Sequence, residues 1–147
     1  MRYSEIIESK ALVASKVFVL STREPNENFI NEHIGFITTD GYFVEMSGHR
    51  NTGEGDTYKI AKPIKYKASD LKKQYEVKNY EDFKLPVEIK LSMEIPHNDH
   101  INEPAENCGS YVVSMIRANG HDFVPSSYKI DHIYSSLKQF FNKKRGA

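Results

Sequence analysis

The stretch EPAENCGSYVVSMIRANG, residues Glu103–Gly120, carries start and stop signals for a helix and holds the only cysteine of the chain. Pro104 favours a helix start, and Asn107 is a good N-cap because its side chain accepts hydrogen bonds from free backbone N–H groups. Asn119-Gly120 is a typical C-terminal stop. The pattern therefore predicts a helix with Cys108 at its N-terminus.

Cys108 has two interpretations. At a helix N-terminus the free N–H groups and the positive end of the helix dipole favour the thiolate, which predicts a lowered Cys108 pKa and a reactive nucleophile. The other interpretation is a small buried hydrophobic residue, because free cysteine is among the most buried residue types. A nucleophilic cysteine needs a base, so a partner histidine decides between the two.

The bulk composition indicates one domain, residues 1–147, long enough to bury a core of its own. Twenty basic and twenty acidic residues cancel, so no overall charge attracts nucleic acid or an anionic membrane. The N-terminus lacks the build of a signal peptide, and no apolar run reaches the length of a membrane span. We expect synthesis in the cytoplasm, and export by a route that needs no signal peptide stays open.

No cofactor and no metal ion are expected. A single cysteine excludes an intramolecular disulfide and makes a cysteine-based zinc site implausible. Ser47–Thr57 is glycine-rich but lacks the Gly and Lys spacing of a phosphate-binding loop. His97, Asp99 and His100 lie in a polar loop, where Pro and Asn do not fix the geometry of metal ligands.

Sequence periodicity places the other elements. β-Branched and aromatic runs closed by turn residues indicate strands, and apolar residues at helical spacing indicate helices. The predicted strands are Lys16–Thr22, His33–Thr39, Tyr42–Ser47, an edge strand within Tyr58–Tyr66, and Leu85–Ile95. The further predicted helices are Ser4–Ser15, Ser69–Tyr75 and Tyr128–Phe141. The segment Lys62–Lys84 combines Lys with Tyr, but its acidic residues favour a solvated face over a nucleic-acid surface.

Asp40-Gly41 between two β-rich runs is a strong hairpin signal, because Gly adopts the positive φ of a tight turn. A three-residue loop would pair Thr38 with Tyr42 and put Glu45 on the face of His33, diagonal to it. A two-residue loop would put Glu45 on the opposite face. The hairpin register therefore tests whether Glu45 can act on His33.

Of the six histidines, His33 opens a predicted core strand, whereas the other five fall in loops or on an exposed helix face. A general base must be held rigidly near the thiol, which favours His33 as the partner of Cys108. The alternative is a strand histidine with a purely structural role.

The order of these signals resembles the circularly permuted branch of the NlpC-like papain-fold cysteine hydrolases, a superfamily that also includes lecithin retinol acyltransferase-like enzymes. His33–Ile37 followed by Asp40–Ser47 is similar to the branch's His-x-Gly-aliphatic hairpin and its aliphatic-Glu-Ala or Ser strand. Asn107–Val112 is similar to its Asn-Cys-Ser-x-Phe-Val helix start. Lys16–Thr22 fits the first strand, and Pro125–Leu137 fits the closing helix more loosely.

The resemblance implies an α+β, papain-like fold in which a central antiparallel sheet packs against the nucleophile helix. It implies Cys108 as the nucleophile, His33 as the base, and Glu45 or another polar side chain as the group that orients the imidazole. The backbone N–H of Cys108 would help to stabilise the oxyanion. The chain departs from the branch in lacking Trp and in having Gly109 after the cysteine, which leaves the substrate pocket undefined.

The implied reaction is amide hydrolysis through an acyl-enzyme. Bacterial cell-wall peptides are the expected substrates, and an enzyme that cleaves them could act as a secreted effector toxin. Lipid acyl hydrolysis or acyl transfer, and deamidation of a protein glutamine, would use the same centre. The expected partners are a peptide or acyl substrate and, for a toxin, a cognate inhibitor protein. The alternative from another class is a binding or immunity-type protein with an inert cysteine.

Overall fold

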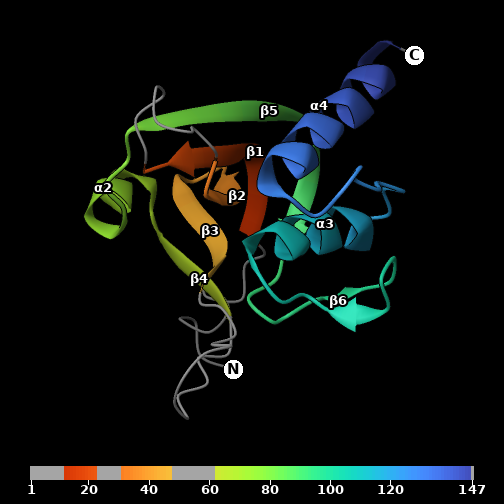
Figure 1. Ribbon diagram of the computed structural model, residues 1–147, viewed down its shortest axis with the longest axis horizontal. Coiled ribbons are helices and arrows are strands. Elements are labelled where there is room, and N and C mark those ends of the chain that lie inside the picture. Colours follow the sequence, from red (N-terminus) through yellow and green to blue (C-terminus); the bar gives the residue numbers. More distant parts are fainter. Residues whose placement is uncertain (1–11, 23–30, 48–61, 147) are drawn as a thin grey trace, which may run out of the picture.

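The computed structural model describes residues 12–22, 31–47 and 62–146 and confirms the α+β class with an antiparallel sheet (Figure 1). The strands lie in the order β4-β3-β2-β1-β5 across the sheet. They are β1 (Leu12–Ser21), β2 (His33–Thr38), β3 (Tyr42–Ser47), β4 (Lys62–Lys67) and β5 (Asn79–Leu91). A separate small hairpin joins β6 (His97–Asn98) to β7 (Glu103–Pro104). The helices are the 3-10 turn η1 (Ala68–Asp70), α2 (Leu71–Gln74), α3 (Cys108–Ala118) and α4 (Ile130–Gly146).

β1 is an interior strand of the sheet and pairs with β2 on one side and with the edge strand β5 on the other. It begins at Leu12, so the helix predicted for Ser4–Ser15 is wrong over its last four residues. Ala14 in this part is buried and pairs with residues of both neighbouring strands. Backbone partners on two sides override a weak helical pattern, which is a tertiary effect that local propensity does not report. The rest of that prediction lies outside the described residues.

The two edge strands each contain a proline. Pro63 lies in β4, as the edge-strand prediction for this segment required, and Pro86 lies in β5. An edge strand tolerates proline because only one side of its backbone forms a ladder. β5 therefore runs through Pro86 and begins and ends earlier than the predicted strand Leu85–Ile95.

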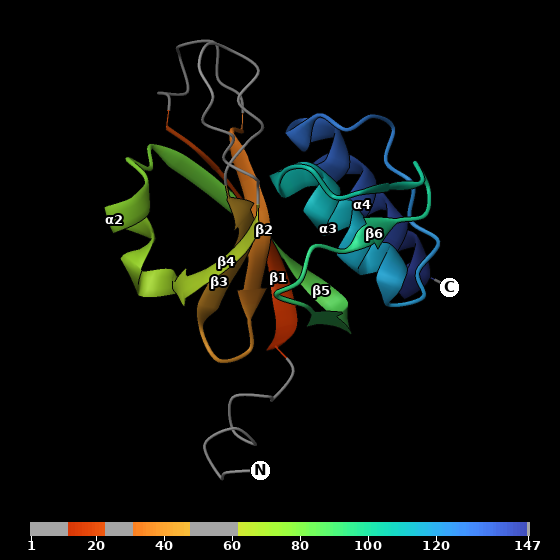
Figure 2. The same ribbon diagram turned by 90° about the horizontal axis from the view of Figure 1, so that it is seen from below.

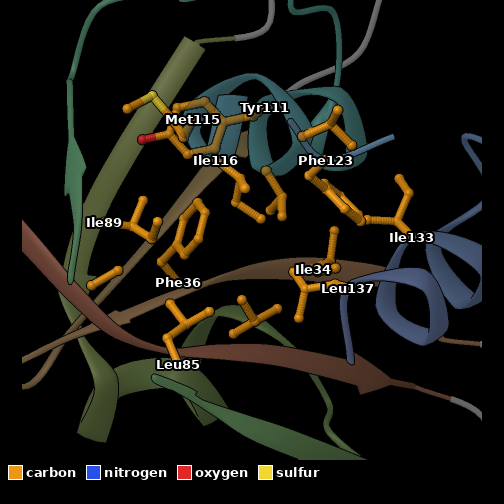
Figure 3. Packing of buried hydrophobic residues seen from close by; sticks show 14 of the residues in the cluster. Ile34, Phe36, Leu85, Ile89, Tyr111, Met115, Ile116, Phe123, Ile133 and Leu137 are labelled. Atoms are coloured by element: carbon orange, nitrogen blue, oxygen red, sulfur yellow. The ribbon is translucent and has the colours of Figure 1, made fainter. Parts of the chain in front are cut away.

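The main core lies on one face of the sheet, because strand side chains alternate between two faces. Ile34 and Phe36 of β2 and Ile89 of β5 meet the apolar residues of α3 and α4 there (Figure 3). Figure 2 shows the pair α3 and α4 on this side of the sheet and α2 on the other side.

A second, smaller apolar cluster lies on the opposite face. Phe18, Leu20 and Phe43 are its buried members, and side chains from the connection between β4 and β5 pack on them. These include Leu71 of α2 and Tyr75 directly after it. The connection between the two edges of the sheet thus covers the second face.

α3 is buried from Gly109 to Ile116 and contacts β2, β3, β5, β6 and α4. A helix enclosed in this way is apolar on most of its surface, as the sequence of α3 is. α4 buries Ile133, Leu137 and Phe141, which have the predicted helical spacing. In the part of the chain that the structure describes, no helix is both long and apolar enough to cross a membrane.

Candidate active site

The hairpin of β2 and β3 has the register that puts Glu45 on the face of His33. Phe36 pairs with Val44, and Gly41 has a φ of 88°, so the loop is the three-residue kind. His33 Nδ1 lies 3.9 Å from Glu45 Oε1. This distance allows an ion pair and is longer than a hydrogen bond. The strand alternation therefore brings two of the three predicted site residues together.

Gly35 is required by the close packing of this hairpin. A Cβ atom at Gly35 would lie 2.7 Å from the carbonyl oxygen of Val44 and 2.7 Å from Cζ of Phe43. Real Cβ atoms do not approach backbone oxygen so closely, so any side chain would push β2 away from β3. The glycine in the His-x-Gly motif thus keeps His33 and Glu45 at their short separation.

Glu45 is completely buried, and two phenols hold one of its oxygens. Tyr66 and Tyr75 donate hydrogen bonds of 2.8 Å and 2.6 Å to Oε2. Among the described residues Oε1 has no hydrogen-bond partner, and it faces His33. Leaving a buried polar atom unsatisfied costs about 1–3 kcal/mol, so an atom of this kind in a folded protein needs an explanation.

Cys108 is the first residue of α3, as predicted, and a reciprocal cap fixes it there. The side chain of Asn107 accepts a 2.9 Å hydrogen bond from the backbone N–H of Ser110. Ser110 Oγ in turn accepts hydrogen bonds from the backbone N–H groups of Glu106 and Asn107. An N-cap of this kind stabilises a helix by about 1 kcal/mol. The cap therefore holds the thiol at a defined place at the helix start.

The sulfur of Cys108 lies beside β2, at the end of the strand where His33 is found. The backbone of Ile34, the residue after His33, hydrogen-bonds to the thiol and favours its ionised form. Glu45 and Tyr75 are both close enough to interact electrostatically with Cys108. The three predicted site residues thus gather at one end of the sheet.

The pKa of Cys108 is raised, which corrects the expectation of a lowered pKa at a helix N-terminus. Burial of the thiol is the largest cause, because it disfavours the charged thiolate. The negative charge of Glu45 acts in the same direction. Backbone hydrogen bonds from Ile34, Gly109 and Cys108 itself lower the pKa without outweighing burial. Desolvation of the thiol outweighs the helix dipole here, and at neutral pH it favours the uncharged form of Cys108.

The pKa of His33 is lowered from its ordinary value of 6.5. Burial disfavours the imidazolium and is the largest cause, while the carboxylates of Glu45 and Glu32 act against it. At neutral pH the ring is therefore uncharged. A neutral imidazole can accept a proton, as a general base must.

A pocket of about 440 Å³ opens beside Cys108, between the N-terminal ends of α3 and α4. Tyr128, Lys129 and Asp131 contribute to its wall. Asn31, just before β2, also lines the pocket, and its Nδ2 donates a 2.6 Å hydrogen bond to Oδ1 of Asp131. The segment that leads into His33 is thereby attached to the start of α4 across the pocket.

Gly109 stands where the Asn-Cys-Ser helix start has Ser, and it has a packing role. A Cβ atom there would lie 2.8 Å from Cδ1 of Ile133 in α4. It would also lie 3.6 Å from the backbone oxygen of Tyr128, which lines the pocket. Gly109 therefore lets the beginnings of the two helices approach each other where the pocket forms.

His97 in β6 and His100 in the turn after it lie at hydrogen-bonding distance from uncharged side chains. His97 Nε2 lies 3.2 Å from Oδ1 of Asn102, and His100 Nδ1 lies 3.1 Å from the hydroxyl of Tyr128. Within the described ranges no three side chains of His, Cys, Asp or Glu group in a way that could hold a metal ion. The glycine-rich loop predicted at Ser47–Thr57 lies, after its first residue, outside the described residues.

No protein-family model, curated protein or solved structure matches the chain.

Tyr66 and Tyr75 are the site residues that the sequence interpretation missed, because both lie in the segment read as a solvated face. A signal for Tyr66 exists in the strand alternation. Tyr66 pairs with Phe43 across β3 and β4, and residues two apart share a face, so Tyr66 belongs to the face of Glu45. For Tyr75, which follows a short helix, no comparable periodic signal exists.

Proposed function

We propose that this protein is a cysteine hydrolase that cleaves an amide bond through an acyl-enzyme, with Cys108 as the nucleophile and His33 as the general base. The observation that carries the proposal is the contact of His33 Nδ1 with the buried carboxylate of Glu45, at the strand end that meets the Cys108 thiol. The proposed fold relationship is to the permuted NlpC-like papain fold. The hairpin of β2 and β3 followed by a helix that starts at Asn107-Cys108 supports it.

The first step starts from a neutral thiol and a neutral imidazole, in keeping with the raised pKa of Cys108 and the lowered pKa of His33. His33 takes the thiol proton as the sulfur attacks the carbonyl carbon of the amide. The carboxylate of Glu45 beside Nδ1 stabilises the imidazolium that forms and leaves Nε2 to exchange the proton. Catalytic hydrogen bonds often tighten when substrate binds, so the 3.9 Å separation suits a resting site.

The second step collapses the tetrahedral intermediate. The backbone N–H groups at the start of α3, among them that of Cys108, are the proposed oxyanion donors. His33 returns its proton to the leaving amine, the C–N bond breaks and a thioester forms on Cys108. Water, deprotonated by His33, then hydrolyses the thioester and restores the thiol.

Amides of bacterial cell-wall peptides are the proposed substrates. Lys129 and Asp131 put side chains of opposite charge on the wall of the pocket beside Cys108. A peptide that carries both amino and carboxylate groups complements such a wall better than a uniformly apolar acyl chain does. If the protein acts as an exported toxin, the same pocket is the proposed target of its cognate inhibitor protein.

The experiment incubates the purified protein separately with bacterial wall peptides, a short-chain acyl thioester and a glutamine-containing protein. New amines, free thiol and ammonia report the three reactions, and mass spectrometry reports an acyl group on Cys108. We expect amine release from wall peptides, none in Cys108→Ala, and a loss of about 10²–10⁴-fold in His33→Ala. Release of thiol or ammonia alone would move the assignment to acyl or glutamine substrates. With no turnover and no acyl adduct, the inert binding protein would be the better explanation.

A further inference from the structure

We propose that Tyr75 is a positioning residue that fixes the orientation of the His33 ring and selects the Glu45 oxygen that faces it. The inference rests on the proposed function, because it assigns Tyr75 a part in the reaction of Cys108 and His33. Tyr75 makes two independent contacts, one to each of the two groups. Its ring centroid lies 4.2 Å from that of His33, and its hydroxyl donates to Glu45 Oε2 at 2.6 Å.

The hydroxyl contact determines which carboxylate oxygen is free. A carboxylate oxygen accepts about two hydrogen bonds, and Tyr66 and Tyr75 together supply two to Oε2. Oε1 is buried and, among the described residues, receives no hydrogen bond. The imidazole at 3.9 Å is therefore the group in position to use Oε1. Without the phenols the carboxylate could turn either oxygen toward the ring.

The ring contact determines how the imidazole lies. The planes of Tyr75 and His33 are inclined by 36°, so the phenol covers one face of the imidazole and limits its rotation. With Nδ1 held toward Glu45, Nε2 points away from the carboxylate and is the nitrogen available for the thiol proton. Tyr75 also interacts electrostatically with Cys108, so it lies near all three proposed site residues.

Tyr75 itself is firmly placed. Its backbone N–H donates a 3.0 Å hydrogen bond to the carbonyl of Leu71, the first residue of α2. Leu71 and Val77 pack with Tyr75 on the apolar cluster of the second sheet face. The backbone N–H of Lys78 donates to the carbonyl of Ser21, the last residue of β1, at 2.9 Å. A side chain held by a packed, hydrogen-bonded segment can impose an orientation on a neighbour.

Three variants distinguish this positioning role from a role in which Tyr75 only donates a hydrogen bond to the buried carboxylate. Tyr75→Phe removes the hydroxyl and keeps the ring, and Tyr75→Leu removes both. Tyr66→Phe is the matched control, because it removes the other hydroxyl on the same oxygen, and among the described residues the ring of Tyr66 packs on Phe43 and not on His33. Thermal unfolding of each variant checks that it folds, and Tyr75→Phe is the change that alters the packing least.

The first readout is acetylation of Cys108 by p-nitrophenyl acetate, measured against pH. The Sγ–C bond forms, the ester C–O bond breaks with release of p-nitrophenolate, and the thiol proton passes to His33. The second readout is the tautomer and pKa of His33 from ring ¹⁵N chemical shifts. Wild type should show the neutral ring protonated on Nδ1, because that N–H faces Glu45.

We expect acetylation in Tyr75→Leu to fall roughly 100-fold, the order of loss that misplacing a catalytic group causes, with a mixture of His33 tautomers. Tyr75→Phe should recover part of the loss. Tyr66→Phe should lose clearly less than Tyr75→Leu does, because it leaves the ring of Tyr75 in place on His33. If Tyr75→Leu kept the wild-type His33 tautomer and acetylation rate, the inference about Tyr75 would be overturned and the proposed function would stand. Equal losses in Tyr66→Phe and Tyr75→Leu would overturn the inference too, because the carboxylate would then only need its donors. If His33→Ala acetylated as fast as wild type, the proposed function itself would fail.

Discussion

His33 Nδ1 lies 3.9 Å from Glu45 Oε1, across a hairpin whose register is set by Gly41 at its turn. A slip by one residue would turn Glu45 to the face of α3 and leave His33 without a carboxylate. The proposed base therefore depends on a turn several residues from it.

Replacement of the Glu45 charge should lower the pKa of His33 further. The negative charge of Glu45 raises the pKa of His33, while burial lowers it below 6.5. Glu45→Gln removes the charge and leaves the effect of burial unopposed by it. The amide keeps an acceptor for Tyr66 and Tyr75, so the fold should persist. ¹H–¹⁵N titration of His33 in both proteins measures the change. A higher pKa in Glu45→Gln would mean that the two side chains do not interact as described.

Alkylation of Cys108 by iodoacetamide should have its midpoint at higher pH in the folded protein than in the chain unfolded by urea. A raised pKa means a smaller thiolate fraction at any given pH, and only the thiolate is alkylated. Midpoints are compared rather than rates, because burial also slows access of the reagent. Glu45→Gln should move the folded midpoint to lower pH, since the Glu45 charge contributes to the raised pKa. A folded midpoint below that of the unfolded chain would restore the expectation of a stabilised thiolate.

Gly35→Ala should destabilise the fold more than Gly41→Ala does. The first change puts Cβ 2.7 Å from backbone oxygen and should cost about 3 kcal/mol. The second meets no atom within 4 Å but has a φ of 88°, which costs about 1 kcal/mol for an L residue. Urea unfolding gives both free energies. An equal cost at the two positions would contradict the close approach of β2 and β3.

The effect of Gly109→Ala on the free energy of unfolding should depend on the residue at position 133. In wild type the added Cβ meets Ile133 Cδ1 at 2.8 Å and should cost about 1–2 kcal/mol. Ile133→Val removes that methyl group at a cost of about 1 kcal/mol. In the Ile133→Val protein, Gly109→Ala should be neutral or stabilising, because Ala has a higher helix propensity than Gly. The four proteins form a double-mutant cycle, and additive free energies would show that α3 and α4 do not meet there.

Asn107→Ala should lower the free energy of unfolding by about 1 kcal/mol, because the N-cap of α3 is lost. Asn107→Asp keeps an acceptor for the Ser110 N–H and should retain most of the stability. Alkylation of Cys108 in Asn107→Ala should also become faster at a given pH, since fraying of the first turn exposes the thiol. Unchanged stability in Asn107→Ala would indicate that Ser110 alone holds the helix start.

The hairpin and the cysteine helix could be predicted because local chemistry decides both. Gly41 supplies a positive φ between two β-rich runs, and Asn107 caps the helix with its own side chain. Of the two tyrosines on Glu45, Tyr66 shares a strand face with Glu45 and leaves a periodic signal, whereas Tyr75 could not be found from the sequence. Tyr75 reaches His33 because the connection from one sheet edge to the other folds over the second face, which no local pattern specifies.

The pKa of Cys108 likewise could not be predicted from local sequence alone. The helix start could be predicted, and with it the backbone N–H groups that favour the thiolate. Burial depends on how α3 packs against the sheet, and the effect of Glu45 depends on which strand end lies beside the helix. Both are tertiary quantities, and together they outweigh the local contribution.

The sheet and the two long helices come from successive parts of the chain, with β1 to β5 made before α3 and α4. During synthesis the proposed base and its carboxylate therefore leave the ribosome well before the nucleophile does. Under the proposed mechanism the nascent chain has no hydrolytic centre until α3 docks, and a chain that stops short of Cys108 never acquires one. A polypeptide split in the loop before β6 should likewise be inactive as separate halves and regain acetylation of Cys108 when the halves associate.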